Sequence, residues 1–346
     1  MDGKSGKARR KALHKKSSAK PRPWSEAQIE RARQLAIQKY LKPKHPASEP
    51  YLRNADPRHN VVAVGVARKR VKGRDRAEVG ITFYVRHKFT KEALKQVPAK
   101  FHLPEKIHGI PTDVIKAGEP KFLWGVHKPS RPAHPGARIL VHQSNGMEQF
   151  GTYGILAEDD NGRRYILSNN HVLANFDANP PGTRVFQPER PFRIARFTTA
   201  VPLAPNFPND TDCALARLDS PSDGDSILPA PVGPLSSGTP TAATHAMRVA
   251  KFGAVTNATR GTVQSTALAV DLAGYHFDNL IQIEDDAAAF CDHGDSGALI
   301  VERGTRRPVG LLMGRMGNFS FACSLDRVLA RLSAVLGSAV KILTGT

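Results

Sequence analysis

Three short segments of the sequence place a residue suited to acyl-transfer chemistry beside an apolar run. His171 follows the apolar run of Tyr165-Ile-Leu, and Asp212 stands just before Ala214–Leu218. Ser296 lies in a Gly-Asp-Ser-Gly sequence that leads into another apolar run. The three residues are separated by 41 and then 84 positions, so only a folded chain would bring them together.

The residue types suit one reaction. A serine hydroxyl is a weak nucleophile at neutral pH and needs a base within hydrogen-bond reach. Histidine suits that role because its pKa is about 6.5, and a buried carboxylate orients the imidazole. Glycines beside the serine let the N–H groups of Gly294 and Ser296 point at one oxyanion. We therefore expect Ser296 as nucleophile, His171 as base and Asp212 as its orienting partner.

The chain order of the three residues separates the possible folds. No histidine follows Ser296, which excludes the Ser…Asp…His order of α/β-hydrolases if Ser296 is the nucleophile. A subtilisin order would need Asp159 or Asp160, which stand in an expected turn. His…Asp…Ser is the chymotrypsin order. Two alternatives to this role of Asp212 remain. Asp212 could only cap the strand that follows, or Asp210 could be the partner of the histidine.

Many short strands divided by turns are expected to position these residues, which is typical of a β-barrel or sandwich. The Asn-Gly pair at 161–162 predicts a hairpin. Strands are expected at Gly151–Glu158, Arg163–Ser168, Arg184–Gln187, Ala214–Leu218, Met247–Phe252, Gly261–Val270, Leu280–Glu284, Ala298–Glu302 and Pro308–Met313. A final helix is capped by Ser324, with an apolar stripe of Leu325, Val328, Leu329, Leu332 and Leu336.

A small α+β accessory unit is expected over residues 25–129. Ser25 and Gln28 form a capping-box pattern ahead of a helix that runs to about Leu41, and a Pro-containing linker follows, Lys42 to His59. Two strands, a short helix and a further strand are then expected at Val61–Lys69, Glu78–Arg86, Thr90–Gln96 and Pro111–Ile115.

The three motifs resemble those of the chymotrypsin superfamily of serine proteases. A closer resemblance is to bacterial trypsin-like peptidases related to the plant narrow-leaf protein. It rests on Asn169–Leu173 around the histidine, on Val309–Leu312 with the closing helix, and on the Pro-Thr-Asp-Val segment Pro111–Val114. It covers roughly residues 60–340.

This resemblance implies a mainly β, chymotrypsin-like double β-barrel over residues 130–346, with the triad in the cleft between the barrels. It implies a serine endopeptidase that cleaves protein or peptide substrates through an acyl-enzyme, without cofactor or metal. The chain departs from the pancreatic enzymes because no activation site precedes the barrels, so Asp295 lacks a new N-terminus as partner. Phe290 stands where trypsin-like enzymes use an aspartate, which predicts an apolar specificity pocket at Phe290 and Gly314.

The positive charge is confined to the first part of the chain. The net charge of +19 divides into +8 for residues 1–23, +12 for 24–130 and −1 for 131–346. Residues 1–24 are expected to form a disordered basic tail. The tail could be a solubilising arm, could bind nucleic acid, or could hold an acidic protein or membrane surface. A catalytically silent binding module recruited through this basic half is the alternative function, and a latent protease gated by the accessory unit is another.

The three cysteines, Cys213, Cys291 and Cys323, form no C-x-x-C pair, so neither a disulfide framework nor a zinc site is expected. Cys291 and His293 have no second metal-binding pair, and His293 is expected to be a solvated loop residue. Asp295 is expected to support the oxyanion loop. Without a secretory signal or a long apolar run, the sequence favours a cytoplasmic location and no membrane span.

Overall fold

The structure is a computed structural model that describes residues 24–41, 55–71, 74–118, 120, 129–143 and 146–345, without side chains for 69–71 and 74–78. The predicted basic tail, apart from Trp24, and residues 42–54 of the predicted linker lie outside the described residues. None of the helices in the described ranges is long and apolar enough to span a membrane.

The first barrel is built from strands of the middle of the chain. Pairing runs from β5 to β6, from β7 to β8 and β11, and back through β10 and β9 to β5. Only Tyr153 and Gly154 separate β6 from β7. The two strands therefore act as one bent strand, which closes the barrel. The bounds are β5 Arg138–His142, β6 Glu148–Thr152, β7 Ile155–Glu158, β8 Arg164–Ser168, β9 Arg184–Phe186, β10 Arg193–Ala200 and β11 Ala214–Leu218.

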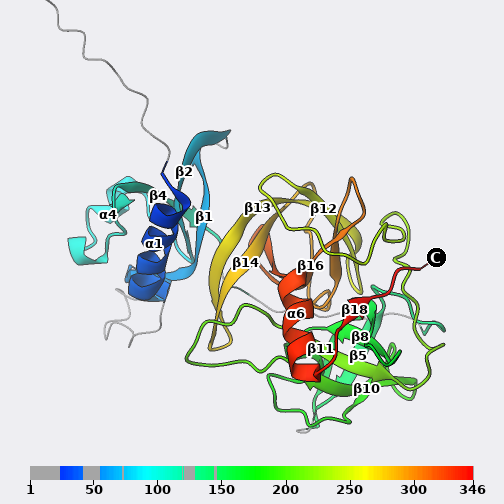
Figure 1. Cartoon of the computed structure of the whole chain (residues 1–346). Helices are drawn as coiled ribbons and strands as arrows, with labels where there is room; N and C mark the ends of the chain where they lie inside the picture. The colour runs from blue at the N-terminus through cyan, green and yellow to red at the C-terminus, as the bar shows by residue number, and fades with distance from the viewer. Residues whose placement is uncertain are drawn as a thin grey trace, which may run out of the picture.

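The second barrel repeats this connectivity. Its order is β12-β15-β16-β17-β14-β13, and β13 pairs back with β12 to close the ring. The bounds are β12 Arg248–Gly253, β13 Asn257–Leu272, β14 Tyr275–Asp285, β15 Leu299–Glu302, β16 Pro308–Met316 and β17 Phe319–Ser324. Two barrels with the same strand order form the chymotrypsin-like double barrel, so the predicted fold class is confirmed (Figure 1).

The break between β6 and β7 brings the two barrels together. A Cβ atom at Gly154 would lie 2.2 Å from the carbonyl oxygen of Gly297 and 2.8 Å from that of Leu167. A side chain at this position would therefore push the serine loop of the second barrel away from the first. The sequence predicted one continuous strand, Gly151–Glu158, and this interruption is a correction to it.

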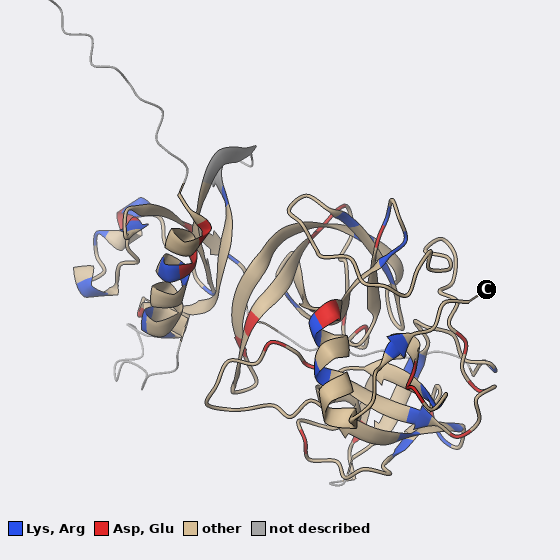
Figure 2. Cartoon of the chain, viewed as in Figure 1, with Lys and Arg blue, Asp and Glu red and all other residues tan. Residues whose placement is uncertain are grey.

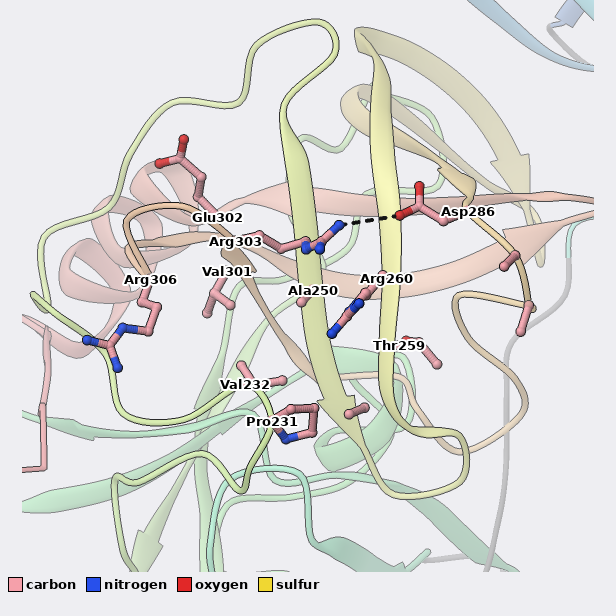
Figure 3. A pocket seen from close by; sticks show the side chains of 13 residues that line it. Pro231, Val232, Ala250, Thr259, Arg260, Asp286, Val301, Glu302, Arg303 and Arg306 are labelled. Atoms are coloured by element: carbon pink, nitrogen blue, oxygen red, sulfur yellow. Dashed lines mark ion pairs between the residues drawn. The ribbon is translucent and has the colours of Figure 1, made fainter.

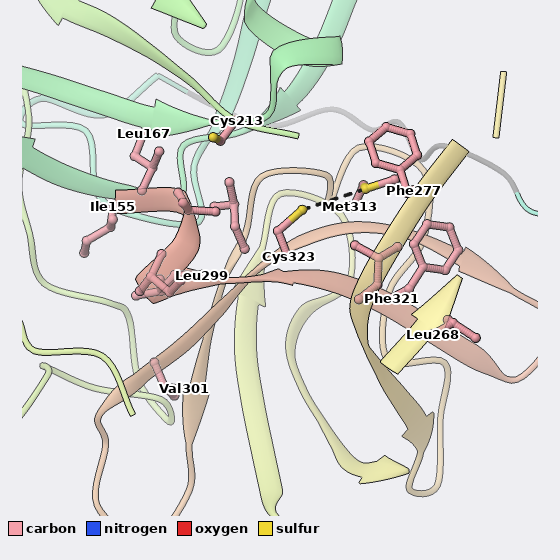
Figure 4. Close-up of a cluster of buried hydrophobic side chains, with 14 of the residues drawn as sticks. Ile155, Leu167, Cys213, Leu268, Phe277, Leu299, Val301, Met313, Phe321 and Cys323 are labelled. Atoms are coloured by element: carbon pink, nitrogen blue, oxygen red, sulfur yellow. Dashed lines mark hydrogen bonds between the residues drawn. The ribbon is translucent and has the colours of Figure 1, made fainter. Parts of the chain in front are cut away.

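A shared core lies between the barrels. It contains Leu167 and Cys213 from the first barrel and Leu299, Met313 and Cys323 from the second (Figure 4). Helix α6, Leu325–Leu336, covers this junction by contacting β10 and β16, with Val328 and Leu332 buried as predicted. A short strand, β18 Lys341–Ile342, then pairs with β7.

The accessory unit extends the sheet of the second barrel. Its helix α1, Glu26–Ala36, begins at the predicted Ser25–Gln28 capping box and continues as a π-helical turn, Ile37–Leu41. Strand β1 pairs with β13 through Ala63–Val270 and Val64–Ala269. The remaining elements are α3 Pro57–Asn60, β1 Val61–Val71, β2 Arg74–Val85, α4 Lys91–Leu94, a 3₁₀ turn Ala99–Phe101, β3 Lys106–Ile107 and β4 Ile110–Lys116.

Charges of both signs are interspersed over the two barrels in Figure 2, in line with the net charge of −1 for residues 131–346. The domain boundaries at residues 24 and 129 stay a prediction. The β1–β13 pairing nevertheless shows that the accessory unit and the second barrel share one sheet.

Candidate active site

His171 and Asp212 are brought together by the pairing of β8 with β11. His171 lies on a single helical turn, α5 (Asn170–Leu173), just after β8, and Asp212 lies just before β11. The Nδ1 atom of His171 lies 2.5 Å from Oδ2 of Asp212, and the backbone N–H of His171 donates to Oδ1 at 3.1 Å. Because a carboxylate only accepts, Nδ1 is the donor, and a neutral ring then has Nε2 as its basic nitrogen.

Contacts from both barrels hold Asp212 in place. The side-chain amide of Asn169 donates to the carbonyl of Asp212 at 2.7 Å. The backbone N–H of Asp212 donates to Sγ of Cys323 at 3.2 Å. Burial and the negative charge of Asp212 raise the pKa of the Cys323 thiol far above its usual range, so it stays neutral. Asp210 instead pairs with Arg331 at 3.0 Å, so Asp212 is the residue beside the histidine.

The serine loop of the second barrel lies against the first barrel. The backbone N–H of Thr152 donates to the carbonyl of Ser296 at 2.8 Å. A Cβ atom at Gly297 would lie 2.2 Å from Oγ of Ser168, three residues before His171. The hydroxyl of Ser296 donates to the carbonyl of Met313 at 3.1 Å. The β16–β17 ladder shifts register between Leu312 and Gly314, so Met313 sits at this irregularity.

A chain of contacts links the carboxylate side of the site to the serine side. The thiol of Cys323 lies 4.0 Å from Sδ of Met313, the contact drawn as a dashed line in Figure 4. Cys323 also accepts from Asp212, and Met313 accepts from Ser296 through its carbonyl. The exposed fractions are 1% for His171 and 0% for Asp212 and Ser296, so the three residues are closed off from solvent.

The predicted oxyanion donors lie on a loop with two left-handed glycines. Gly294 and Gly297 have φ values of +103° and +92°, which favour glycine. The neighbouring amides of Asp295 and Gly297 donate to Asp292 and Leu312. Within the described part of the chain, the N–H groups of Gly294 and Ser296 donate to no other residue. Two amides are thus available to a developing oxyanion.

A buried ion pair supports this loop. The Nζ atom of Lys251 lies 3.1 Å from Oδ2 of Asp295, and both side chains are 0% exposed. The N–H groups of Asp292, Val255 and Thr256 donate to the same carboxylate at 2.9, 2.9 and 3.2 Å. These contacts confirm the expected ion pair and hydrogen bonds of Asp295. Burial lowers the pKa of the Lys251 ammonium, although the charge of Asp295 opposes the shift.

Sequence reasoning missed Lys251 as a functional residue. Its only signal was a lysine inside the apolar strand Met247–Phe252, at a position whose neighbours in the strand pattern are apolar.

A second missed feature is an aromatic stack on the histidine. The ring centroids of Phe176 and His171 lie 6.0 Å apart with an interplanar angle of 30°, and Tyr275 stacks on Phe176 at 5.5 Å and 6°. Asn175, Phe176 and Asp177 have φ values of 50°, 54° and 67°. Three consecutive left-handed residues other than glycine carry backbone strain, so the turn that places Phe176 over the imidazole is held there by its surroundings.

The residues of the predicted specificity pocket are not open to solvent. The ring of Phe290 is 0% exposed and packs in the interior of the second barrel with Val249, Val263 and Ile283. It therefore does not line an open pocket in this conformation. Gly314 is also buried, directly after Met313 in β16. The apolar pocket stays a prediction without support from Phe290.

His293 is half-buried rather than solvated, and its Nδ1 atom has no hydrogen-bond partner among the described residues. This corrects the expectation of a solvated loop histidine. Among those same residues, no three His, Cys, Asp or Glu side chains gather as metal ligands would.

Comparison with known proteins found neither a matching family model nor a matching curated protein. Similar solved structures include protease A of Thermobifida fusca, 16% identical over 62% of this chain and 100% of that chain, with a TM-score of 0.44. A Nocardiopsis protease is 14% identical over 60% and 99%, with a TM-score of 0.43. A chymotrypsin of Cellulomonas bogoriensis is 16% identical over 61% and 98%, with a TM-score of 0.41.

Proposed function

We propose that the chain is a serine endopeptidase that cleaves peptide bonds through an acyl-enzyme. One observation carries this proposal above the others. His171 and Asp212 form a buried hydrogen bond of 2.5 Å on the first barrel. The Gly-Asp-Ser-Gly loop of the second barrel is held against the first barrel by the Thr152–Ser296 hydrogen bond. A general base with an orienting carboxylate, beside a serine, is the arrangement that nucleophilic acyl transfer needs.

The proposed reaction uses each residue in turn. The hydroxyl of Ser296 leaves the carbonyl of Met313, turns to Nε2 of His171 and attacks the scissile carbonyl as His171 takes its proton. The oxyanion accepts from the N–H groups of Gly294 and Ser296. The C–N bond breaks when His171 gives its proton to the leaving amine. Water, activated by His171, then hydrolyses the ester and restores the serine.

The resting site must open before a substrate enters. Phe176 covers one face of the imidazole, and the side chains of the triad are almost wholly buried. Peptide binding therefore has to displace the Phe176 ring, and the energy of that displacement comes from substrate contacts. This favours an enzyme that acts on extended, well-bound peptides over one that acts on small esters.

A peptide-library cleavage profile of the full chain tests the proposal. We expect cleavage by the wild type and none by Ser296→Ala or His171→Ala. Ser265→Ala, a buried serine in β13, is the matched control and should cleave as the wild type does. Equal cleavage by Ser296→Ala and the wild type would reject the assignment, and no cleavage by a folded wild type would favour the silent binding module.

A further inference from the structure

A second pocket lies on the outer face of the second barrel, apart from the triad. Its volume is about 710 Å³, and Figure 3 shows it between the β12–β13 hairpin, the Pro231–Val232 segment and the loop at Asp286. Its floor is apolar and includes Val232, Ala250 and Val301. The interior of the barrel lies on the opposite side of these strands, where Val249 and Ile300 point. Pockets of this volume accommodate small organic ligands.

Three arginines surround the apolar floor. Arg303 pairs with Asp286 at 3.7 Å across the pocket, as the dashed line in Figure 3 shows. Among the described residues, the guanidinium groups of Arg260 and Arg306 make no hydrogen bond or ion pair. Glu302, the other acid of the pocket, accepts a hydrogen bond from Thr305. The pocket therefore holds three guanidinium groups against two carboxylates, and neither Arg260 nor Arg306 is paired directly with a carboxylate among the described residues.

Arg306 occupies the left-handed position of the β15–β16 turn, where its N–H donates to the carbonyl of Glu302 and the N–H of Glu302 donates to Arg307. Its φ of 57° lies in the left-handed region, where glycine or asparagine costs less. Its backbone is thus held by the turn and by the N–H of Ser236, while its exposed guanidinium makes no ion pair within the described residues. A ligand that engages the guanidinium would give this side chain a role.

We propose that this pocket binds a small ligand that joins an oxyanion, a carboxylate or phosphate, to an apolar body. The apolar floor would take the body, and Arg260 and Arg306 would hold the oxyanion, because guanidinium groups match carboxylate and phosphate in charge and shape. The pocket is distinct from the triad and from the predicted specificity pocket.

Hydrogen bonds connect the pocket to the oxyanion loop. The hydroxyl of Thr259, which lines the pocket, donates to the carbonyl of Phe290 at 2.5 Å, and Phe290 lies five residues before Asp295. The amide of Asp286 donates to the carbonyl of Arg260 at 3.3 Å. On the same hairpin, Thr256 donates to Asp295 and the carbonyl of Asn257 accepts from Lys251. The pocket walls therefore continue into the groups that hold Asp295.

Through these hydrogen bonds, a bound ligand would affect acylation of the serine. This effect rests on the proposed peptidase activity. A bound oxyanion competes with Asp286 for Arg303 and repels that carboxylate. The loop from Asp286 to Phe290 then loses its ion pair with Arg303, the residue that follows β15, and the Asp295 loop behind it becomes less ordered. A ligand in this pocket is therefore a negative effector of acylation.

Calorimetry on the full chain tests binding without relying on activity. The probes are 4-phenylbutyrate and phenyl phosphate, with neutral 4-phenylbutanol as the control ligand. We expect one or both anions to bind at least about tenfold more tightly than the alcohol, and Arg260→Gln or Arg306→Gln to remove that preference. Which anion binds more tightly distinguishes a carboxylate ligand from a phosphate. Arg217→Gln, an exposed arginine on the first barrel, is the matched control and should bind as the wild type does.

The rate of labelling by a fluorophosphonate, which phosphonylates activated serines, tests the effect. The better anion should slow labelling of the wild type severalfold and leave the rate of Arg260→Gln unchanged. Equal affinity for anions and alcohol, or unchanged affinity in both arginine variants, would overturn the site. Selective binding without a change of rate would keep the site and overturn the effect. If the fluorophosphonate never labels the wild type, the proposed peptidase activity is rejected. Calorimetry would still decide whether the pocket binds the ligand.

Discussion

At the scale of single residues, the buried carboxylates of Asp212 and Asp295 hold different parts of the candidate site. The carboxylate of Asp212 accepts from Nδ1 and from the backbone N–H of His171. Asp295 faces away and orders the loop that carries Gly294 and Ser296 through Lys251 and three backbone amides. One aspartate thus orients the proposed base, and the other orients the proposed oxyanion donors.

Replacing Asp212 by asparagine tests the orienting role. An amide can donate to Nδ1 and so favour the wrong tautomer, which leaves Nε2 protonated. We expect the fluorophosphonate labelling rate to fall by about 10³–10⁴-fold while the fold is kept. Asp210→Asn is the matched control two residues away and should label at the wild-type rate. An equal loss in both variants would contradict the assignment of Asp212.

Lys251 gives the site an alkaline limit. The ion pair with Asp295 exists only while Lys251 is protonated, and burial lowers the pKa of this ammonium. As the pH rises through that lowered pKa, the pair is lost, so labelling should fall at a pH below the usual lysine value of about 10.4.

Two variants accompany this pH profile. Lys251→Met leaves Asp295 buried without a cation, and its free energy of unfolding should fall by about 3–5 kcal/mol. Lys341→Met, at an exposed lysine, should keep the wild-type profile. A flat labelling rate up to the usual lysine range would contradict the role of Lys251.

At the scale of elements, the stacked turn at Asn175–Asp177 closes the site. Its strained backbone is held by Asp177, which accepts from the side chain of Asn170 at 2.6 Å and from the amide of Leu203 at 2.7 Å. Tyr275, at the tip of the β13–β14 hairpin, reaches from the second barrel to cover Phe176. A turn of the first barrel and a hairpin of the second thus cover the imidazole together.

Removing the Phe176 ring should open the site. Phe176→Ala is expected to speed labelling about two- to tenfold, the range to which a stacking energy of about 0.5–1.5 kcal/mol corresponds. Phe207→Ala, at a phenylalanine that is 70% exposed, should leave the rate unchanged. If Phe176→Ala is labelled more slowly than the wild type, the ring positions His171 instead of covering it.

Sequence patterns predicted the elements that carry strong apolar alternation. The three motif segments, the hairpin at the Asn-Gly pair and the final helix with Val328 and Leu332 were all found from such patterns. Strands β5, β10 and β17 were missed, although each contains residues with strong strand preference such as Ile, Val or Phe. The β6–β7 break was missed because the need for Gly154 arises from a loop almost 150 residues away. Lys251 and Phe176 depend in the same way on partners from distant segments.

At the scale of the whole molecule, a buried ion pair fastens the accessory unit to the second barrel. Arg33 on α1 hydrogen-bonds both carboxylate oxygens of Asp278 on β14, the second at 3.2 Å, and it also pairs with Glu30. Burial works to raise the pKa of the Asp278 carboxyl, but the hydrogen bonds from Arg33 outweigh it and hold the pKa below its usual value. The helix and the barrel are therefore joined by charge as well as by the β1–β13 pairing.

Breaking this pair should loosen the accessory unit. Arg33→Met leaves Asp278 without its cation, and we expect a loss of about 3–5 kcal/mol in the free energy of unfolding, measured by urea denaturation. Arg31→Met, on the exposed face of the same helix, should change stability by less than about 0.5 kcal/mol. Similar losses in the two variants would show that α1 is not held through Arg33.

The same pair predicts acid sensitivity. A carboxyl whose folded-state pKa is lowered contributes its full stability above the unfolded pKa of about 3.9. That contribution is lost as the pH falls through the lower folded-state pKa. Asp278→Asn should therefore flatten the acid limb of the stability profile. An unchanged limb in this variant would assign acid sensitivity to other carboxylates.

Peptide mapping after fluorophosphonate labelling tests the central claim most directly. The full chain is labelled to completion, digested and analysed by mass spectrometry for the modified peptide. We predict one phosphonyl group, on Ser296, and none after the same treatment of His171→Ala. A label on any other serine, or undiminished labelling without His171, would contradict the triad.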